Sequence, residues 1–103
     1  MLYDLFMISR GSQNRGQLIE HIKTTSKILM QKDCVIRKIQ SMGLKKLPYR
    51  IKKNGVTNFE GHYWQILFYG RPSVQNELRD ILRKDEEVIR MEILKQGTAL
   101  NTL

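Results

Sequence analysis

One quarter of the chain holds most of its uncompensated positive charge. Residues 34–59 contain no aspartate or glutamate, but they contain seven basic residues: Arg37, Lys38, Lys45, Lys46, Arg50, Lys52 and Lys53. The flanking segments carry only +2 (1–33) and −1 (60–103) of the total charge of +8. Because lysine and arginine neutralise anionic groups, such a focused run predicts a site for a polyanion. The alternative is a solvated strand and loop that only keeps the protein soluble.

No set of residues suited to metal binding or catalysis accompanies this segment. His21 and His62 are far apart in the sequence, and neither has a partner at zinc-ligand spacing. Cys34 has no neighbouring base, and the chain contains no glycine-rich phosphate loop. The acids of residues 85–90 are typical of a solvated turn. We therefore expect no enzyme activity, no metal, no cofactor and no small-molecule substrate.

The histidines and the cysteine each have a simpler structural interpretation. His21 falls on the polar side of a predicted helix, where we expect it to be solvated. His62 follows the basic segment and is a candidate for nucleic-acid contact, with strand-end packing or solvent as the alternative. Cys34 begins a strand and is expected to fill a small apolar space. As the only cysteine, it can form no intramolecular disulfide.

Length and composition predict one globular domain. The chain has 103 residues, of which 41% are hydrophobic, and this is enough for one core without disulfides. No apolar run approaches the ~20 residues that span a bilayer, so we expect no membrane partner. The N-terminus has no basic segment before its apolar stretch, and it reads as a strand and not as a signal peptide. We expect the domain over residues 1–95 and a frayed tail over 96–103.

The first half of the chain predicts a strand, a helix and a second strand. Residues 2–9 are almost wholly apolar, as in a strand that is covered on both faces. Asn14 and Gln17 have the spacing of a capping box, and about four turns of amphipathic helix follow them. Residues 34–42 are rich in β-branched side chains and predict a strand, which Gly43 interrupts.

After this interruption, apolar and polar side chains alternate over residues 46–52, which predicts that the strand resumes. Pro48 cannot donate a backbone hydrogen bond, so the strand should lie at a sheet edge or contain a bulge. Asn54 and Gly55 form a turn signal, and we expect a loop over residues 52–61.

The second half of the chain repeats the order of the first. Residues 62–69 predict an aromatic strand, Pro72 begins a helix, and alternation over 87–94 predicts the last strand. The resulting order is βαββαβ, which is typical of an α+β, ferredoxin-like fold. Right-handed crossovers place both helices on one face of a four-stranded antiparallel sheet. The other face is left open, and an apolar open face favours a partner.

Two further functions remain as alternatives. Residues 60–68, EGHYWQILF, loosely resemble the third strand of RNA recognition motifs, whose exposed aromatic side chains stack on single-stranded bases. That function requires Tyr63 or Phe68 to be exposed, whereas packing in the core is the other interpretation of these aromatics. Residues 10–16 supply the arginine and asparagine of an acylphosphatase-like phosphate loop, but they lack the glycine pattern of that enzyme family.

Four segments resemble bacterial-type small-subunit ribosomal protein six and its mitochondrial relatives. They occur in the family's order and spacing, and they are MLYDLFMI (1–8), GLKKLPYRI (43–51), EGHYWQILF (60–68) and KDEEVIRMEILK (84–95). The resemblance covers about residues 2–95. Pro48 and the MLY opening favour a mitochondrial, fungal-like member, which would work in the mitochondrial matrix, over a protein of the bacterial cytoplasm.

The resemblance implies a structural role in the small ribosomal subunit and in translation. It implies binding to the central domain of small-subunit ribosomal RNA at the platform, together with small-subunit protein eighteen and neighbouring ribosomal proteins. The positions that match the family's motifs are Lys45, Lys46, Tyr49, Arg50 and Arg90. From charge and location we add Arg37, Lys38, Lys52, Lys53 and His62 as RNA-binding candidates.

Overall fold

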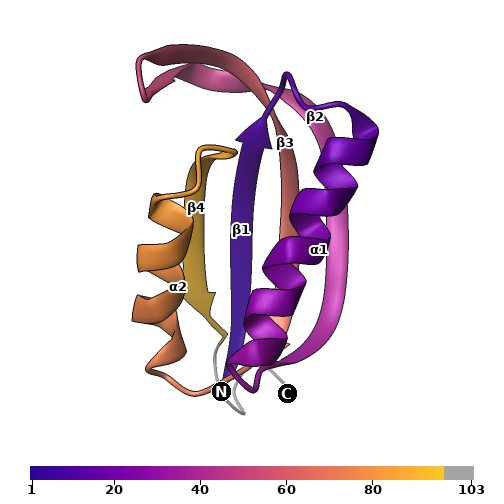
Figure 1. Cartoon of the computed structure of the whole chain (residues 1–103), viewed down its shortest axis with the longest axis vertical. Helices are drawn as coiled ribbons and strands as arrows, with labels where there is room; N and C mark the ends of the chain where they lie inside the picture. The colour runs from indigo at the N-terminus through magenta and orange to yellow at the C-terminus, as the bar shows by residue number, and fades with distance from the viewer. Residues whose placement is uncertain (97–103) are drawn as a thin grey trace.

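The computed structural model describes residues 1–96 (Figure 1). Six elements follow one another: β1 (Leu2–Arg10), α1 (Arg15–Gln31), β2 (Val35–Lys53), β3 (Val56–Tyr69), α2 (Val74–Arg83) and β4 (Val88–Lys95). The strands form one antiparallel sheet in the order β2-β3-β1-β4, and both helices cover the same face of it (Figure 1). The predicted α+β, ferredoxin-like fold is confirmed.

The expected loop over residues 52–61 is wrong. β2 is one strand of 19 residues and β3 begins at Val56, so only Asn54 and Gly55 connect the two strands. These two residues have φ angles of 51° and 81°, and positive φ is what a two-residue hairpin turn requires. Backbone pairing with β2 holds polar residues such as Thr57 in the strand. Local composition does not reveal this pairing.

Helix α1 begins as the sequence predicts, and α2 begins slightly later. The Asn14 side chain accepts from the Gln17 backbone N–H at 2.8 Å, and Gln17 Oε1 accepts from the Asn14 N–H at 2.9 Å. Ser73 is the N-cap of α2 and Val74 its first residue, so Pro72 precedes the helix and does not open it. Within residues 1–96, no helix is long and apolar enough to cross a membrane.

The main core lies between the sheet and the two helices. Its largest fully buried side chains on β1 and β3 are Tyr3, Leu5, Met7, Trp64, Ile66 and Phe68. α2 adds Leu78 and Leu82, and burial of this apolar surface is the main favourable contribution to folding. Cys34 is buried beside this core, as predicted for a small apolar residue, and burial raises the pKa of its thiol.

His21 is buried, so the expectation of a solvated residue is wrong. Its Nδ1 lies 3.0 Å from Ser9 Oγ, and its Nε2 lies 3.1 Å from Asp85 Oδ2. The Trp64 ring meets the imidazole edge-on, and Trp64 Nε1 donates to the same Ser9 oxygen at 2.8 Å. α1 can bury a polar residue here because both ring nitrogens have partners. Ser9 is itself fully buried, so this chain of hydrogen bonds belongs to the core.

The predicted tail begins with a residue that the sheet holds in place. The backbone N–H of Gln96 donates to the Leu2 carbonyl oxygen at 2.8 Å, and its side-chain amide donates to the Asp4 carboxylate. Residues 97–103, the rest of the predicted tail, lie outside the described residues. Within residues 1–96, contacts with β1 therefore continue past the end of β4 to Gln96.

Gly61 marks a close approach between β3 and β1. A Cβ atom at this position would lie 2.8 Å from the Ser9 carbonyl oxygen and would also collide with the Ile8 side chain. We expect Gly61→Ala to lower the free energy of unfolding by about 1–3 kcal/mol in urea denaturation. Gly16→Ala is the control, because a Cβ there meets only Asn14 Oδ1 at 3.4 Å. If Gly61→Ala is as stable as the wild type, the close approach of β3 to β1 does not exclude a side chain at this position.

Candidate nucleic-acid interface

The β2–β3 hairpin extends beyond the sheet and carries most of the predicted basic site. Between Lys46 and Ile51 the register shifts, so that residues 47–50 stand opposite Phe59 alone. A bulge of this kind bends a strand pair, and Figure 1 shows the end of the hairpin turning across the top of the sheet. Pro48 lies inside this bulge on an edge strand, as its missing N–H predicts.

Apolar contacts tie the bent hairpin to the face of the sheet that the helices leave open. Leu47 and Ile51 are buried and form a second, smaller core with Ile89. Ile8 and Tyr63 pack against this cluster from β1 and β3. Leu47 and Ile51 therefore anchor the hairpin, and the polar side chains that alternate with them are exposed to solvent.

Lys53 contributes to this anchoring. Its Nζ donates to the backbone carbonyl oxygen of Asp85 at 2.9 Å and to that of Val88. Burial lowers the pKa of Lys53, and the nearby Asp85 and Glu86 carboxylates oppose this shift. Lys53 is predicted to bind RNA, but in the structure its ammonium group makes hydrogen bonds within the molecule.

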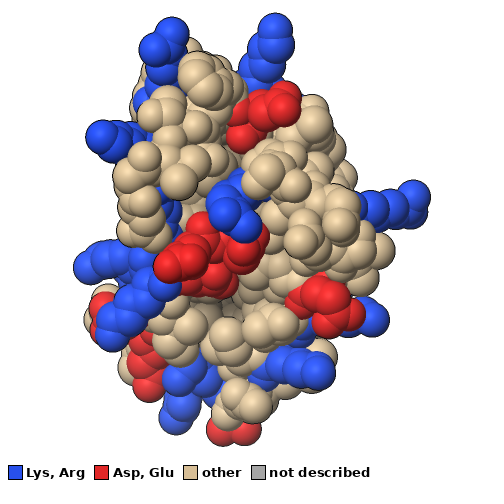
Figure 2. Space-filling view, turned by 45° about the horizontal axis from the view of Figure 1, so that its top comes forward, with Lys and Arg blue, Asp and Glu red and all other residues tan. Residues whose placement is uncertain are grey.

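The other six cations of the basic segment are exposed: Arg37, Lys38, Lys45, Lys46, Arg50 and Lys52. None of them forms a salt bridge within residues 1–96, whereas Arg10, Lys23 and Lys32 elsewhere do. Figure 2 shows Lys and Arg side chains projecting into solvent around the outline of the molecule. The charge along β2 therefore remains uncompensated and attracts anions.

Three of the exposed cations lie over aromatic rings. The pairs, with the distance from the charged group to the ring centroid, are Arg37–Tyr69 at 5.3 Å, Lys45–Tyr63 at 5.7 Å and Arg50–Phe59 at 5.2 Å. Such contacts orient long side chains that would otherwise sample many rotamers. Phe59 is not among the residues predicted from the sequence, because it fell in the expected loop over residues 52–61. The available signal was an isolated aromatic residue four positions after the Asn54–Gly55 turn.

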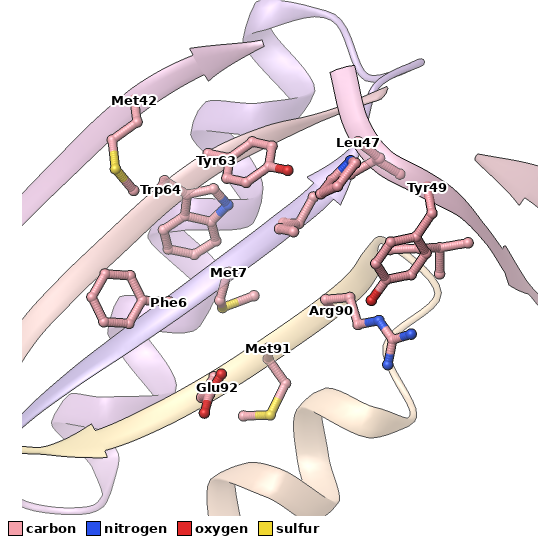
Figure 3. Close-up of a pocket in the computed structure, with 13 residues that line it drawn as sticks. Phe6, Met7, Met42, Leu47, Tyr49, Tyr63, Trp64, Arg90, Met91 and Glu92 are labelled. Carbon is pink, nitrogen blue, oxygen red and sulfur yellow. The ribbon is translucent and has the colours of Figure 1, made fainter. Parts of the chain in front are cut away.

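A groove of about 530 Å³ lies between the bent hairpin and the open face of the sheet. Phe6, Met42 and Tyr63 line one side of it, and Tyr49 and Arg90 stand at the other side (Figure 3). Tyr49 is 61% exposed even though it lines the groove. Tyr49 in the bulge of β2 and Arg90 on β4, both predicted site residues, therefore line the same groove.

The predicted site residues do not all come together. His62 is half-buried, and its Nε2 lies 3.1 Å from the Gln13 carbonyl oxygen, just before α1. Arg37 and Lys38 lie near the start of β2, whereas the bend is close to its other end. The residues grouped around the bend and its groove are Lys45, Lys46, Tyr49, Arg50, Lys52 and Arg90.

Two of the three acids that directly follow α2, Asp85 and Glu87, make contacts within the fold, whereas Glu86 is exposed. Glu87 accepts from the Arg10 guanidinium at 2.7 Å and from the Gln13 side-chain amide. Asp85 accepts from the Glu87 backbone N–H at 2.9 Å and also meets His21. Within residues 1–96, no group of three or more His, Cys, Asp or Glu side chains could hold a metal ion. The contacts of Asp85 and Glu87 are structural, and both side chains are half-buried.

One protein family matches almost the whole chain. The family model described as Ribosomal protein S6 matches residues 2–95. Small ribosomal subunit protein bS6m of Drosophila melanogaster is 30% identical over 93 residues, which are 90% of this chain and 63% of that protein. The protein of the same name from Neurospora crassa is 30% identical over 97 residues, 94% of this chain and 82% of its own length. Small ribosomal subunit protein bS6 of Maricaulis maris is 32% identical over 94 residues, 91% and 77% of the two chains.

A solved structure shares the fold. The crystal structure of 30S ribosomal protein S6 from Thermotoga maritima has a TM-score of 0.86 at 24% sequence identity, covering 98% of this chain and 92% of that chain. The family match spans the four segments that carry the resemblance, which is thereby confirmed. The names of the relatives are those of ribosomal components and not of enzymes. The chain therefore belongs to the ribosomal protein S6 family.

Proposed function

We propose that this protein binds small-subunit ribosomal RNA through the cations of its β2–β3 hairpin. The observation that carries the proposal is the exposure of six cations on β2, none of which pairs with an acid within residues 1–96. Contacts between such cations and phosphates release condensed counterions, which drives association. The family resemblance points to the central domain of the RNA, at the platform, as the region that is bound.

We infer that the open face and its groove are covered by small-subunit protein eighteen in the assembled subunit, with other ribosomal proteins nearby. Phe6, Tyr63 and Leu67 are only half-buried on this face. Apolar surface of this kind is typical of an interaction site. Because two proteins that share both an RNA and an interface bind cooperatively, affinity for the RNA should rise when both are present.

The mitochondrial ribosome, in the matrix, is the proposed location. Relatives from Drosophila melanogaster, Gallus gallus and Neurospora crassa carry the name bS6m, which supports it. Bacterial relatives match as well, so the bacterial cytoplasm is the alternative. An epitope-tagged chain that co-sediments with mitochondrial small subunits supports the first location, and exclusion from those subunits contradicts it.

Binding to a central-domain fragment of small-subunit RNA, measured over a salt series, tests the RNA proposal. If four or five cations contact phosphate, log K should fall with log salt at a slope of about −3 to −4. Protein eighteen should tighten the binding at every salt concentration. A shallow slope, or equal affinity for unrelated RNA with and without the partner, would count against the proposal.

Two neighbouring lysines should respond differently to the same substitution. Lys52 is exposed, so Lys52→Met should make the salt slope shallower by about 1 and leave stability unchanged. Lys53 donates to two backbone carbonyl oxygens, so Lys53→Met should lower the free energy of unfolding by about 1–2 kcal/mol and preserve the slope. Filter binding and urea denaturation measure the two effects. The reversed pattern would contradict both assignments.

The two other functions have less support from the geometry. A recognition-motif mode needs Tyr63 or Phe68 exposed, but Phe68 is fully buried and Tyr63 packs against the second core. An acylphosphatase-like loop needs Arg10 and Asn14 free to hold phosphate. Arg10 instead binds the carboxylate of Glu87, and the Asn14 side chain caps α1.

A further inference from the structure

Phe59 is an aromatic residue that belongs to neither core. It is 60% exposed, and it is the one residue of β3 that stands opposite the four-residue bulge of β2. Its strand neighbours, Asn58 and Glu60, are polar. A polar residue would suit a solvated hairpin equally well at this position. The exposed Phe59 ring contributes its free energy of burial only if another molecule covers it.

Arg50 lies against this ring. The centre of its guanidinium group is 5.2 Å from the Phe59 ring centroid, and Arg50 forms no salt bridge within residues 1–96. A guanidinium is planar, stacks on aromatic faces and binds phosphate through two parallel hydrogen bonds. The pair thus places a flat apolar surface beside a phosphate-binding group. One nucleotide, with a flat base and an anionic phosphate, has the complementary chemistry.

The surroundings of the pair favour nucleic acid over protein as the occupant. Exposed Lys45, Lys46 and Lys52 flank it along β2, and the centres of protein–protein interfaces are depleted of lysine. In a paired A-form helix the faces of the bases are already stacked and hidden. A base that meets the ring must therefore be unpaired.

We propose that Phe59 and Arg50 form a stacking platform for one unpaired base of the bound RNA. This proposal rests on the proposed RNA-binding function and adds to it a base contact that phosphate neutralisation does not supply. Stacking on an aromatic ring tolerates any base. The platform therefore selects an unpaired nucleotide at a given place in the RNA fold and does not read a sequence.

The test uses the full chain and the central-domain fragment of small-subunit RNA, transcribed with 5-bromouridine. Ultraviolet irradiation joins bromouracil to an aromatic ring stacked on it, and mass spectrometry identifies the residue. We expect the crosslink at Phe59. We also expect Phe59→Leu, which keeps an apolar side chain but removes the stack, to lower affinity about tenfold. The salt slope should stay unchanged, because no phosphate contact is lost.

Three controls separate stacking from other effects. Val56→Ala, at another exposed apolar residue of the same hairpin (54%), should bind like the wild type. Arg50→Lys keeps the charge but removes the plane, so it should lower affinity without changing the salt slope. An RNA whose unpaired positions are converted to paired ones should bind wild type and Phe59→Leu equally. Because Phe59 is exposed, the thermal unfolding midpoint of Phe59→Leu should match that of the wild type.

The outcomes distinguish the stacking platform from the proposed RNA-binding function on which it rests. Wild-type affinity and slope for Phe59→Leu would overturn the platform and leave the phosphate interface standing. A loss that appears only when protein eighteen is present would assign Phe59 to a protein contact and overturn the platform as well. If the wild type itself shows no salt-steep binding, both proposals fall.

Discussion

Replacing Lys45, Lys46 and Lys52 together by glutamine should remove most of the affinity for small-subunit RNA while the protein stays folded. All three side chains are exposed and make no salt bridge within residues 1–96. Each phosphate contact contributes about −0.7 to −0.9 to the slope of log K against log salt, which is close to tenfold in affinity at ~0.1 M salt. Three lost contacts should therefore lower affinity by about 10²–10³-fold. The salt slope should become shallower by about 2–3.

The matched control removes the same formal charge from the helical side of the molecule. Lys23 and Lys27 on α1 and Lys84 after α2 are exposed, and replacing all three by glutamine should change affinity by only about threefold through the general field. Thermal unfolding should show both variants folded. Equal losses in the two variants would mean that net charge attracts the RNA and that the hairpin is not the contact surface.

The order of the elements was predictable because each one has a local signal, such as the capping box at Asn14 and Gln17. The extent of β2 and β3 was not. Residues 56–61 combine Thr, Asn, Glu and Gly, which locally favour a loop, and pairing across the hairpin holds most of them in a strand. Gly43, expected to interrupt β2, instead takes a φ of 89° at a register shift while the strand continues through it.

The composition of the candidate site was also predictable, but its grouping was not. The absence of acids from residues 34–59 is visible in the sequence. Lys52 and Lys53 are adjacent and of one type, yet Lys53 bonds to backbone groups 32 and 35 residues away and Lys52 remains exposed. His21 was misjudged for the same reason, because its partners Ser9 and Asp85 are 12 and 64 positions distant. Helical periodicity assigns a face to a residue, but it does not reveal a polar partner on another element.

His21→Ala should be one of the most destabilising single substitutions at a polar position of this chain. The imidazole fills space beside Trp64 and links Ser9 to Asp85. After its removal, Trp64 Nε1 still donates to Ser9 Oγ and Asp85 still accepts from the Glu87 N–H, so neither partner is fully orphaned. The substitution therefore leaves a cavity and removes two hydrogen bonds. Together these should lower the free energy of unfolding by about 2–4 kcal/mol. Urea denaturation should show a lower midpoint with an unchanged m-value.

His62→Ala is the matched control for this prediction. Its ring is half-buried and makes one hydrogen bond within residues 1–96, to the Gln13 carbonyl oxygen, so the loss in free energy of unfolding should be under about 1 kcal/mol. The loss in free energy of unfolding for Ser9→Ala should lie between those for His21→Ala and His62→Ala. Without the Ser9 hydroxyl, the buried Trp64 Nε1 and His21 Nδ1 lose the partner that they share. If His21→Ala costs no more than His62→Ala, the imidazole is solvated as its helical position suggests. Because the His21 network lies between α1 and the sheet, the folded variant should keep the wild-type salt slope for RNA. The contribution of His21 to stability, on the helical side of the sheet, would then be separable from RNA contact at the β2–β3 hairpin.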